Sequence, residues 1–306
     1  MAILSITNKV DLFLGRNQIR DVQKASASNP QVRVLGPGRD WFTVGLRELV
    51  EYHELLYFLV WRDIKVRYKQ SVLGAAWAIL QPFMMMVVFT IFFNRMAGVG
   101  SGDVPYPLFS YAGLLPWTFF AQGLSQSSNS LVGSANLVRK VYFPRVVVPM
   151  SSILSGAVDF ALAFTVLLAM MGYYGVWPTA TIVFLPLFAL LAFVASLGVG
   201  LWLAALNVEY RDVRYVVPFI VQLWLFVTPV IYPSAPVVAK LENAGLPGWL
   251  YGLNPMAGVV EGFRWCLFGG SAPGSILVAS TVSALFLMVS GALYFWRVED
   301  TFADVV

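Results

Sequence analysis

The sequence predicts an all-α integral membrane protein with six transmembrane helices. An amphipathic helix is expected near the N-terminus, at the cytoplasmic interface, and re-entrant helices are expected before the last span. Two observations lead to this fold class. Of the 306 residues, 58% are hydrophobic and only 12% are charged, whereas soluble domains carry about 25% charged residues. The chain also contains several charge-free segments that approach or exceed the roughly 20 residues a helix needs to cross a bilayer.

Composition excludes several kinds of chemistry. The single cysteine, Cys266, permits neither an internal disulfide nor a CxxC metal site, and His53 is the only histidine. No GxxxxGK[ST] phosphate-binding loop occurs, so the chain is not expected to bind ATP in the P-loop manner. Neither a DxD pair nor a GxSxG elbow is present. The sequence therefore predicts a chain that is not an enzyme and binds no metal.

The first 70 residues divide into two parts. Residues 1–43 are expected to form a polar cytoplasmic tail, and no cleaved signal peptide is expected. Residues 44–70 repeat at the helical period, with one apolar and one charged face. The uncharged run 55–61 is too short to span a bilayer, so an interface helix is favoured over a helix of a soluble domain. Its candidate functional residues are Arg62, Asp63, Lys65, Arg67, Tyr68 and Lys69.

Long apolar segments with little or no charge define a six-span domain over 71–306. The spans are predicted at 74–95, 106–133, 147–172, 179–206, 214–232 and 274–296. The second half of the span 106–133 is rich in small polar residues, which suit either close helix contacts or a wet cavity. Residues 233–272 are too interrupted by proline, glycine and charge for one span, and too apolar for an ordinary loop. They are predicted to form re-entrant or interfacial helices.

The distribution of lysine and arginine predicts the orientation. Ten of these residues flank the predicted spans on the side of the N-terminus, and three lie on the other side. Because cytoplasmic loops carry an excess of lysine and arginine, both termini and the loop RKVYFPR (139–145) are predicted to be cytoplasmic. The net charge of +4 therefore reflects sidedness and does not indicate nucleic-acid binding.

Asp159 is the one acidic residue inside a predicted span. It lies about 18 Å along its helix, at 1.5 Å per residue. An intramembrane carboxylate is a candidate functional site. It is read either as a proton carrier or as a structural carboxylate bonded to serines or a tyrosine of a neighbouring span. The structural role is favoured, because no second buried acid, histidine or lysine is found at a similar depth.

Aromatic residues make up 15% of the chain and cluster near the outer ends of the second and fifth predicted spans. An aromatic belt at the membrane interface explains most of them. A sugar-stacking surface is the alternative, since pyranose rings present apolar C–H faces to aromatic rings. For each individual residue the sequence favours the belt.

Five motifs occur in order: WRDIKVRYKQSVLGAAWAILQP (61–82), PYPLFSYAGLLPWTFF (105–120), NLVRKVYFPRVVVP (136–149), NVEYRDVRYVVP (207–218) and TPVIYP…LNPM (228–256). Together they resemble the permease subunits of ABC-type polysaccharide exporters, which move O-antigen, capsular polysaccharide or teichoic-acid polymers. The similarity covers about 45–300, and the ordered combination is more specific than any single motif.

The resemblance implies a subunit that pairs with an identical copy and with two ATP-binding cassette subunits. Those partners would bind ATP and Mg, with no cofactor in this chain. A coupling helix that docks on the ATPase is implied at 139–145. Pro144 can end this short helix, which would leave Tyr142 and Phe143 free to fill a cleft on the partner. The implied coupling residues are Arg139, Lys140, Tyr142, Phe143, Pro144 and Arg145.

The resemblance also implies a pore lined by the first and fifth spans. The channel candidates are Trp77, Phe89, Phe92, Trp224 and Tyr232. The expected function is ATP-driven export of a lipid-linked, O-antigen-like polysaccharide across the bacterial cytoplasmic membrane, with membrane lipids as further partners. Two alternatives stay open: a proton-coupled secondary transporter that uses Asp159, and a drug- or lipid-exporting permease of the same superfamily.

Overall fold

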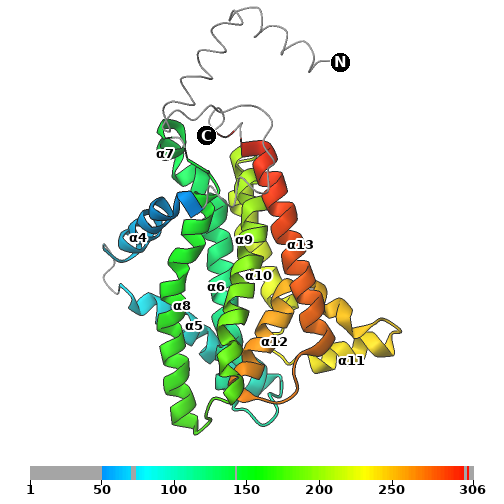
Figure 1. Ribbon diagram of the computed structural model, residues 1–306. Coiled ribbons are helices and arrows are strands. Elements are labelled where there is room, and N and C mark those ends of the chain that lie inside the picture. The colour runs from blue at the N-terminus through cyan, green and yellow to red at the C-terminus, as the bar shows by residue number, and fades with distance from the viewer. Residues whose placement is uncertain (1–49, 70–73, 142, 300–301, 303–306) are drawn as a thin grey trace, which may run out of the picture. The chain divides into compact units, whose positions relative to one another are not determined.

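The computed structural model describes residues 50–69, 74–141, 143–299 and 302, and over these ranges it is helical, with no strand (Figure 1). The predicted tail 1–43, the start of the predicted interface helix and Tyr142 lie outside the described residues. The helices in chain order are α4 (His53–Lys69), α5 (Ala76–Phe89), η1 (Thr90–Met96), α6 (Tyr106–Gly133), α7 (Ala135–Lys140), α8 (Val147–Tyr174), η2 (Ala180–Phe184), α9 (Leu185–Glu209), α10 (Val213–Val227), α11 (Ala235–Asn243), η3 (Gly248–Leu253), α12 (Pro255–Phe268) and α13 (Gly274–Val298).

The core of the bundle is built from α6, α8, α9 and α13, whose axes run in similar directions in Figure 1. α6 packs against both α8 and α9, and α9 packs against α13. α6 is largely enclosed, and its Tyr111, Leu114 and Phe120 side chains are fully buried. This position explains how a helix with many small polar residues lies among apolar ones, because several of its serine side chains are buried against other helices.

α9 and α13 approach each other closely because both carry glycine at the contact. A Cβ atom added to Gly291 would lie 2.2 Å from the backbone oxygen of Gly198. A Cβ atom added to Gly198 would lie 2.5 Å from the backbone nitrogen of Met288. Small residues permit such contacts in membranes, where van der Waals contact drives helix association.

α4 lies across the bundle rather than along it (Figure 1), and it packs against α8. Leu59 is buried on the side of α4 that faces the bundle. Tyr57, Phe58 and Trp61 are exposed. The helix therefore has a second apolar side that no described residue covers.

Arg264 of α12 organises the segment between α10 and α13, which forms the short helices α11, η3 and α12. Its buried guanidinium donates to the backbone oxygens of Phe109 at 3.2 Å, Pro229 at 2.6 Å and Val230 at 2.7 Å. It also lies 3.6 Å from the carboxylate of Glu261. These bonds tie the irregular backbone after α10 to α6 and α12, where apolar surroundings leave no water to satisfy it.

Within the part of the chain that the structure describes, four helices are long and apolar enough to cross a membrane: Ala76–Met96, Val147–Tyr174, Ala180–Glu209 and Gly274–Val298. They correspond to four of the six predicted spans. α6 has 28 residues but a more polar sequence. α10 has only 15 residues, about 22 Å at 1.5 Å per residue. The predicted span 214–232 is too long because the helix stops at Thr228, which is extended and precedes Pro229, a position that disfavours helix.

The close contact between α9 and α13 generates a stability prediction. We expect Gly291→Ala to lower the free energy of unfolding by about 1–3 kcal/mol, the usual cost of forcing atoms into a close-packed site. Thermal unfolding of the purified chain in detergent measures the effect. Gly172→Ala in α8 is the matched control, because a Cβ atom there meets no atom within 4 Å. Equal melting temperatures for the two variants would contradict the close approach.

Candidate functional site

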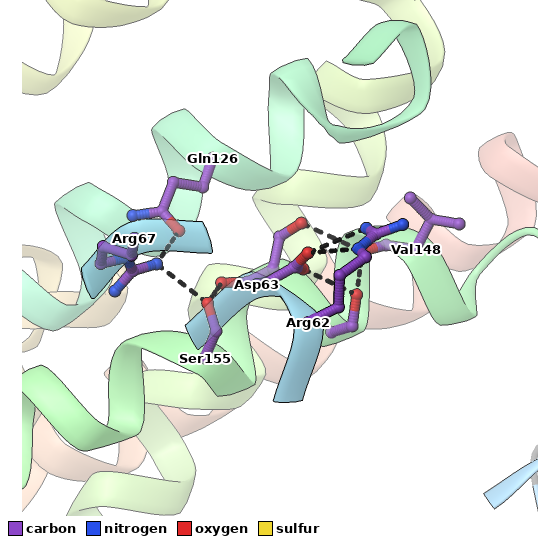
Figure 2. A network of polar contacts seen from close by, with 8 residues as sticks. Arg62, Asp63, Arg67, Gln126, Val148 and Ser155 are labelled. Atoms are coloured by element: carbon purple, nitrogen blue, oxygen red, sulfur yellow. Dashed lines mark hydrogen bonds and ion pairs between the residues drawn. The ribbon is translucent and has the colours of Figure 1, made fainter. Parts of the chain in front are cut away.

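A polar network fixes α4 to α6 and α8 (Figure 2). The Arg67 guanidinium forms an ion pair with Asp159 of α8. It also donates hydrogen bonds to Gln126 of α6 and, at 2.9 Å, to Ser155 of α8. Tyr68 donates its hydroxyl to the second carboxylate oxygen of Asp159. The network therefore joins the predicted interface helix to the predicted intramembrane acid.

A second contact between α4 and α8 lies about one turn earlier. Asp63 accepts a hydrogen bond from Arg62 at 2.8 Å and another from Ser151 of α8 at 3.3 Å. Lys65 and Lys69 are exposed. Of the six residues predicted for the interface helix, four thus hold polar contacts with the bundle or with each other, and the two lysines face outward.

Asp159 is held by a cation and by a hydroxyl donor, which favours a structural carboxylate over a proton carrier. A tyrosine is among its partners, as the sequence suggests, but both partners come from α4 and not from a span. Burial raises the pKa of Tyr68 to about 12, and the hydrogen bond to Asp159 acts in the same direction. Tyr68 therefore stays protonated at neutral pH and remains a donor to the carboxylate.

Three neighbouring cavities follow this network and share lining residues. The first, of about 550 Å³, is bordered by Arg67, Gln126 and the C-terminal end of α6. The second, of about 370 Å³, shares both of these residues and adds Trp77, Gln81 and Gln122. The third, of about 230 Å³, lies between α5, α6 and α10 and shares Gln81 and Gln122 with the second. The cavities form a row from the end of α6 toward its middle.

Four side-chain amides line the second and third cavities, and we call them the glutamine cluster: Gln81, Gln122, Gln126 and Gln222. Gln122 and Gln126 are four residues apart, so they project from one face of α6. Gln126 accepts a bond from Arg67. The amides of Gln81, Gln122 and Gln222 have no hydrogen-bond partner among the residues that the structure describes. Because an amide offers two donors and an acceptor with two lone pairs, the cluster has unused capacity for water, a ligand or another chain.

The sequence reasoning missed the glutamine cluster, although two signals pointed to it. Gln81 interrupts an otherwise apolar helix, and the polar half of α6 suggests either close contacts or a wet cavity. The structure has both a close helix contact and a cavity, and they lie on different faces of α6. A Cβ atom added to Gly200 of α9 would lie 2.5 Å from the Ser127 hydroxyl oxygen, which shows the close contact. Gln122 and Gln126 line the cavities.

The three predicted channel residues of α5 and η1 have different surroundings. Trp77 lines the second cavity, and Phe92 is exposed. Phe89 is only 4% exposed and packs in the core, with its ring 5.7 Å from that of Phe93. The phase of the helix turns Phe89 inward, so it lines none of the three cavities, and its place in a channel stays a prediction.

Of the remaining two channel candidates, Trp224 lies near the end of α10 and Tyr232 lies in the turn after it. The Trp224 indole donates to the Asn254 side chain at 3.0 Å. The Tyr232 hydroxyl donates to the Phe226 backbone oxygen at 2.9 Å. Both aromatic side chains thus fix the end of α10 and the turn after it, and neither lines one of the three cavities.

The predicted coupling segment divides into an exposed part and a buried part. Arg139 and Lys140, at the end of α7, are exposed, as is Val141. Phe143 is 4% exposed and lies in an apolar cluster that includes Val138. The expectation that Phe143 is free to fill a partner's cleft is therefore wrong in this structure, because its ring is buried in its own chain.

Pro144 does not end the short helix. α7 stops at Lys140, and Val141 is extended, whereas the Pro144 backbone oxygen accepts from Val147 at the start of α8. Arg145 donates its backbone N–H to the Glu299 carboxylate at 2.9 Å and its guanidinium to the Glu299 backbone oxygen. The segment after α7 is thus anchored beyond the end of α13.

The Arg67–Asp159 pair predicts an energetic coupling between α4 and α8. In a double-mutant cycle of Arg67→Met and Asp159→Asn, we expect a coupling energy of about 0.5–3 kcal/mol, since each single change leaves the other group without its partner. Thermal unfolding measures the stability, and trypsin cleavage within α4 measures its detachment. Exposed Arg211→Met serves as the control. Strictly additive effects of the two substitutions would show that the pair does not hold α4.

Comparison with known proteins places this chain in a family. The model of the ABC-2 type transporter family matches residues 54–268. The O-antigen export system permease protein RfbA of Myxococcus xanthus is 30% identical over 264 residues, which cover 85% of this chain and 98% of that protein. A protein of the same name from Klebsiella pneumoniae is 27% identical and covers 83% of this chain and 95% of its own length. The polysialic acid transport protein KpsM of Escherichia coli is 25% identical, over 78% of this chain and 91% of that protein. This chain belongs to the ABC-2 type transporter family.

Proposed function

We propose that the chain is the membrane-spanning subunit of an exporter that moves a lipid-linked, O-antigen-like polysaccharide across the bacterial cytoplasmic membrane. Its family membership and the names of its relatives support this function. In the proposal, two separate ATP-binding cassette subunits bind ATP and Mg and hydrolyse the ATP. This chain supplies the path and contains no phosphate-binding loop of the P-loop type.

The proposed topology has six spans, with α6 and α10 as the second and fifth, and with both termini in the cytoplasm. α4 lies in the interface, which agrees with the exposed apolar side chains Tyr57, Phe58 and Trp61. α11, η3 and α12 re-enter the membrane without crossing it. The bonds that Arg264 gives to backbone oxygens support this placement, because non-helical backbone at membrane depth must be satisfied by protein or water.

The observation that carries the proposed function is the glutamine cluster. Sugar hydroxyls are both donors and acceptors, so a glutamine amide can bond them in either sense. Trp77 and Trp117 line the same cavities and offer ring faces to the apolar C–H faces of a pyranose. Among the described residues, the lining of the third cavity is polar in part and carries no charged side chain. Such a lining can hold each sugar weakly enough to let a polymer move on, as conduction through a pore requires.

A second copy of the chain completes the path in this proposal. Gln81 and Gln222 are exposed in the single chain, although α5 and α10 are otherwise strongly apolar. An amide that faces lipid would lose its hydrogen bonds, which is costly in an apolar medium. If α5 and α10 of two copies face a shared polar path, both amides have water or sugar as partners.

The ATPase contact is proposed at the exposed end of α7, with Arg139, Lys140 and Val141 as the contacting residues. α6 and α7 are separated only by Ser134, so a force on α7 reaches the helix that carries Gln122 and Gln126. Arg145 connects the other side of the segment to Glu299. This arrangement provides a mechanical link between the ATPase and the row of cavities.

The glutamine cluster gives the first test of the function. In vesicles that contain the chain and its ATPase, we expect Gln81→Leu with Gln122→Leu to slow transport of a lipid-linked polysaccharide about tenfold or more. Each lost bond to the moving sugar is worth about 0.5–1.5 kcal/mol. Asn243→Leu, at an exposed amide of α11, is the control. Normal transport by the double variant, with the complex assembled, would refute a path along the glutamine cluster.

The second test concerns coupling. We expect the charge reversal Arg139→Glu with Lys140→Glu to abolish polymer-stimulated ATP hydrolysis, since it replaces attraction by repulsion at the partner surface. Membrane insertion should be unchanged. The exposed Arg211→Glu is the matched control. The outcome against the proposal is full stimulation and full export in the Arg139/Lys140 variant.

A further inference from the structure

A fourth cavity, of about 570 Å³, lies between α8 and the continuous helix formed by α5 and η1. It shares no lining residue with the three cavities of the glutamine cluster. One end of its lining is apolar and includes Phe83, Val87 and Val166. The other end carries Arg95, Tyr173 and Tyr174. The cavity therefore has an apolar part and a polar, cationic part.

Among the described residues that line this cavity, Arg95 alone is charged. Its guanidinium takes part in none of the ion pairs or hydrogen bonds formed by the described residues, and its side chain is exposed. It lies in η1, a seven-residue π-helix. π-helical turns are rare and occur frequently at functional sites. An unpaired cation, an unusual backbone and a cavity thus coincide at one place.

The dimensions of the cavity match one leaflet of a membrane. Phe83 and Arg95 are twelve positions apart on a nearly continuous helix, which corresponds to about 18 Å at 1.5 Å per residue. The hydrocarbon core of a bilayer is about 30 Å thick, so each leaflet contributes about 15 Å. Tyr173 and Tyr174 lie at the end of α8, where tyrosine is favoured at the membrane–water interface. The cationic end therefore lies at headgroup depth when the apolar end lies near the bilayer centre.

We propose that this cavity binds an anionic glycerophospholipid from the leaflet at the Arg95 end of the bundle. Its phosphate lies on Arg95, and one acyl chain follows the wall from Ile91 to Phe83. Guanidinium groups bind phosphate oxygens by strong, charge-assisted hydrogen bonds. None of the described lining residues is acidic, so none of them competes for Arg95. The inference requires only that the bundle lies in a membrane, so it does not depend on which polymer is exported.

The test uses the full chain in vesicles of phosphatidylethanolamine with a minor fraction of phosphatidylglycerol that carries a diazirine near the end of one acyl chain. After illumination and digestion, mass spectrometry locates the label. We expect labelling at 83–91 and 166–170. Arg95→Gln should lower it about tenfold, Arg95→Lys should retain most of it, and Lys240→Gln, at an exposed cation of α11, should leave it unchanged.

A second variant keeps the test independent of Arg95. Ala169→Trp places a large ring in the cavity without removing the cation, and it should also lose the label; thermal unfolding confirms that each variant is folded. Three results would overturn the proposal. They are equal labelling in Arg95→Gln, equal labelling by a diacylglycerol probe without phosphate, and competition by a polyprenyl phosphate but not by unlabelled phosphatidylglycerol.

Discussion

Every polar group enclosed by these apolar helices needs a partner inside the protein, and this constraint determines how the helices are arranged. Arg67 meets it by pairing with Asp159, and this pair fixes α4 across α8. Arg264 finds its partners in three backbone oxygens, to which it donates hydrogen bonds. These bonds allow α10 to end within the bundle and the chain to turn back as short helices. Against this background, amides without partners are the exception, and they gather where α5, α6 and α10 meet.

The paired and unpaired groups are physically connected. Arg67 contacts both Asp159 and Gln126, so the residue that holds α4 also borders the row of cavities. At the same end of that row, α6 leads into α7, whose exposed cations are the proposed ATPase contact. A displacement of α7 or α4 therefore acts on the same helix that carries Gln122 and Gln126. This geometry gives the proposed exporter a short route from the ATPase to its path.

Charge-free segments were sufficient to locate most of the helices, because charge is excluded from long apolar helices. The predicted segment 106–133 has the same bounds as α6, and 147–172 differs from α8 by two residues. The end of α10 was predicted too late, although Pro229 marks it. Side-chain directions were less predictable. Phe89 and Phe143 are aromatic residues in suitable segments, but helix phase and tertiary contacts bury both of them.

The contacts of Asp159 could not be derived from sequence, because Arg67 and Tyr68 lie more than 90 residues earlier and come from a helix that crosses the bundle. The glutamine cluster could not be derived from the sequence for the same reason. Gln81, Gln122 and Gln222 come from three helices, and only the fold shows that they line one cavity. Periodicity within one segment carries no information about contacts between side chains of different helices, since these contacts depend on how the helices are rotated relative to one another.

The most direct measurement is site-specific photocrosslinking to the moving polymer in cells that contain the chain and its ATPase. A photoreactive phenylalanine analogue replaces Gln122, and in a separate variant it replaces Phe286, which is 69% exposed on the outer side of α13. The account predicts a sugar-labelled adduct at position 122 during export and none at position 286. Absence of the adduct at 122 during active export, or equal adducts at both positions, would contradict it.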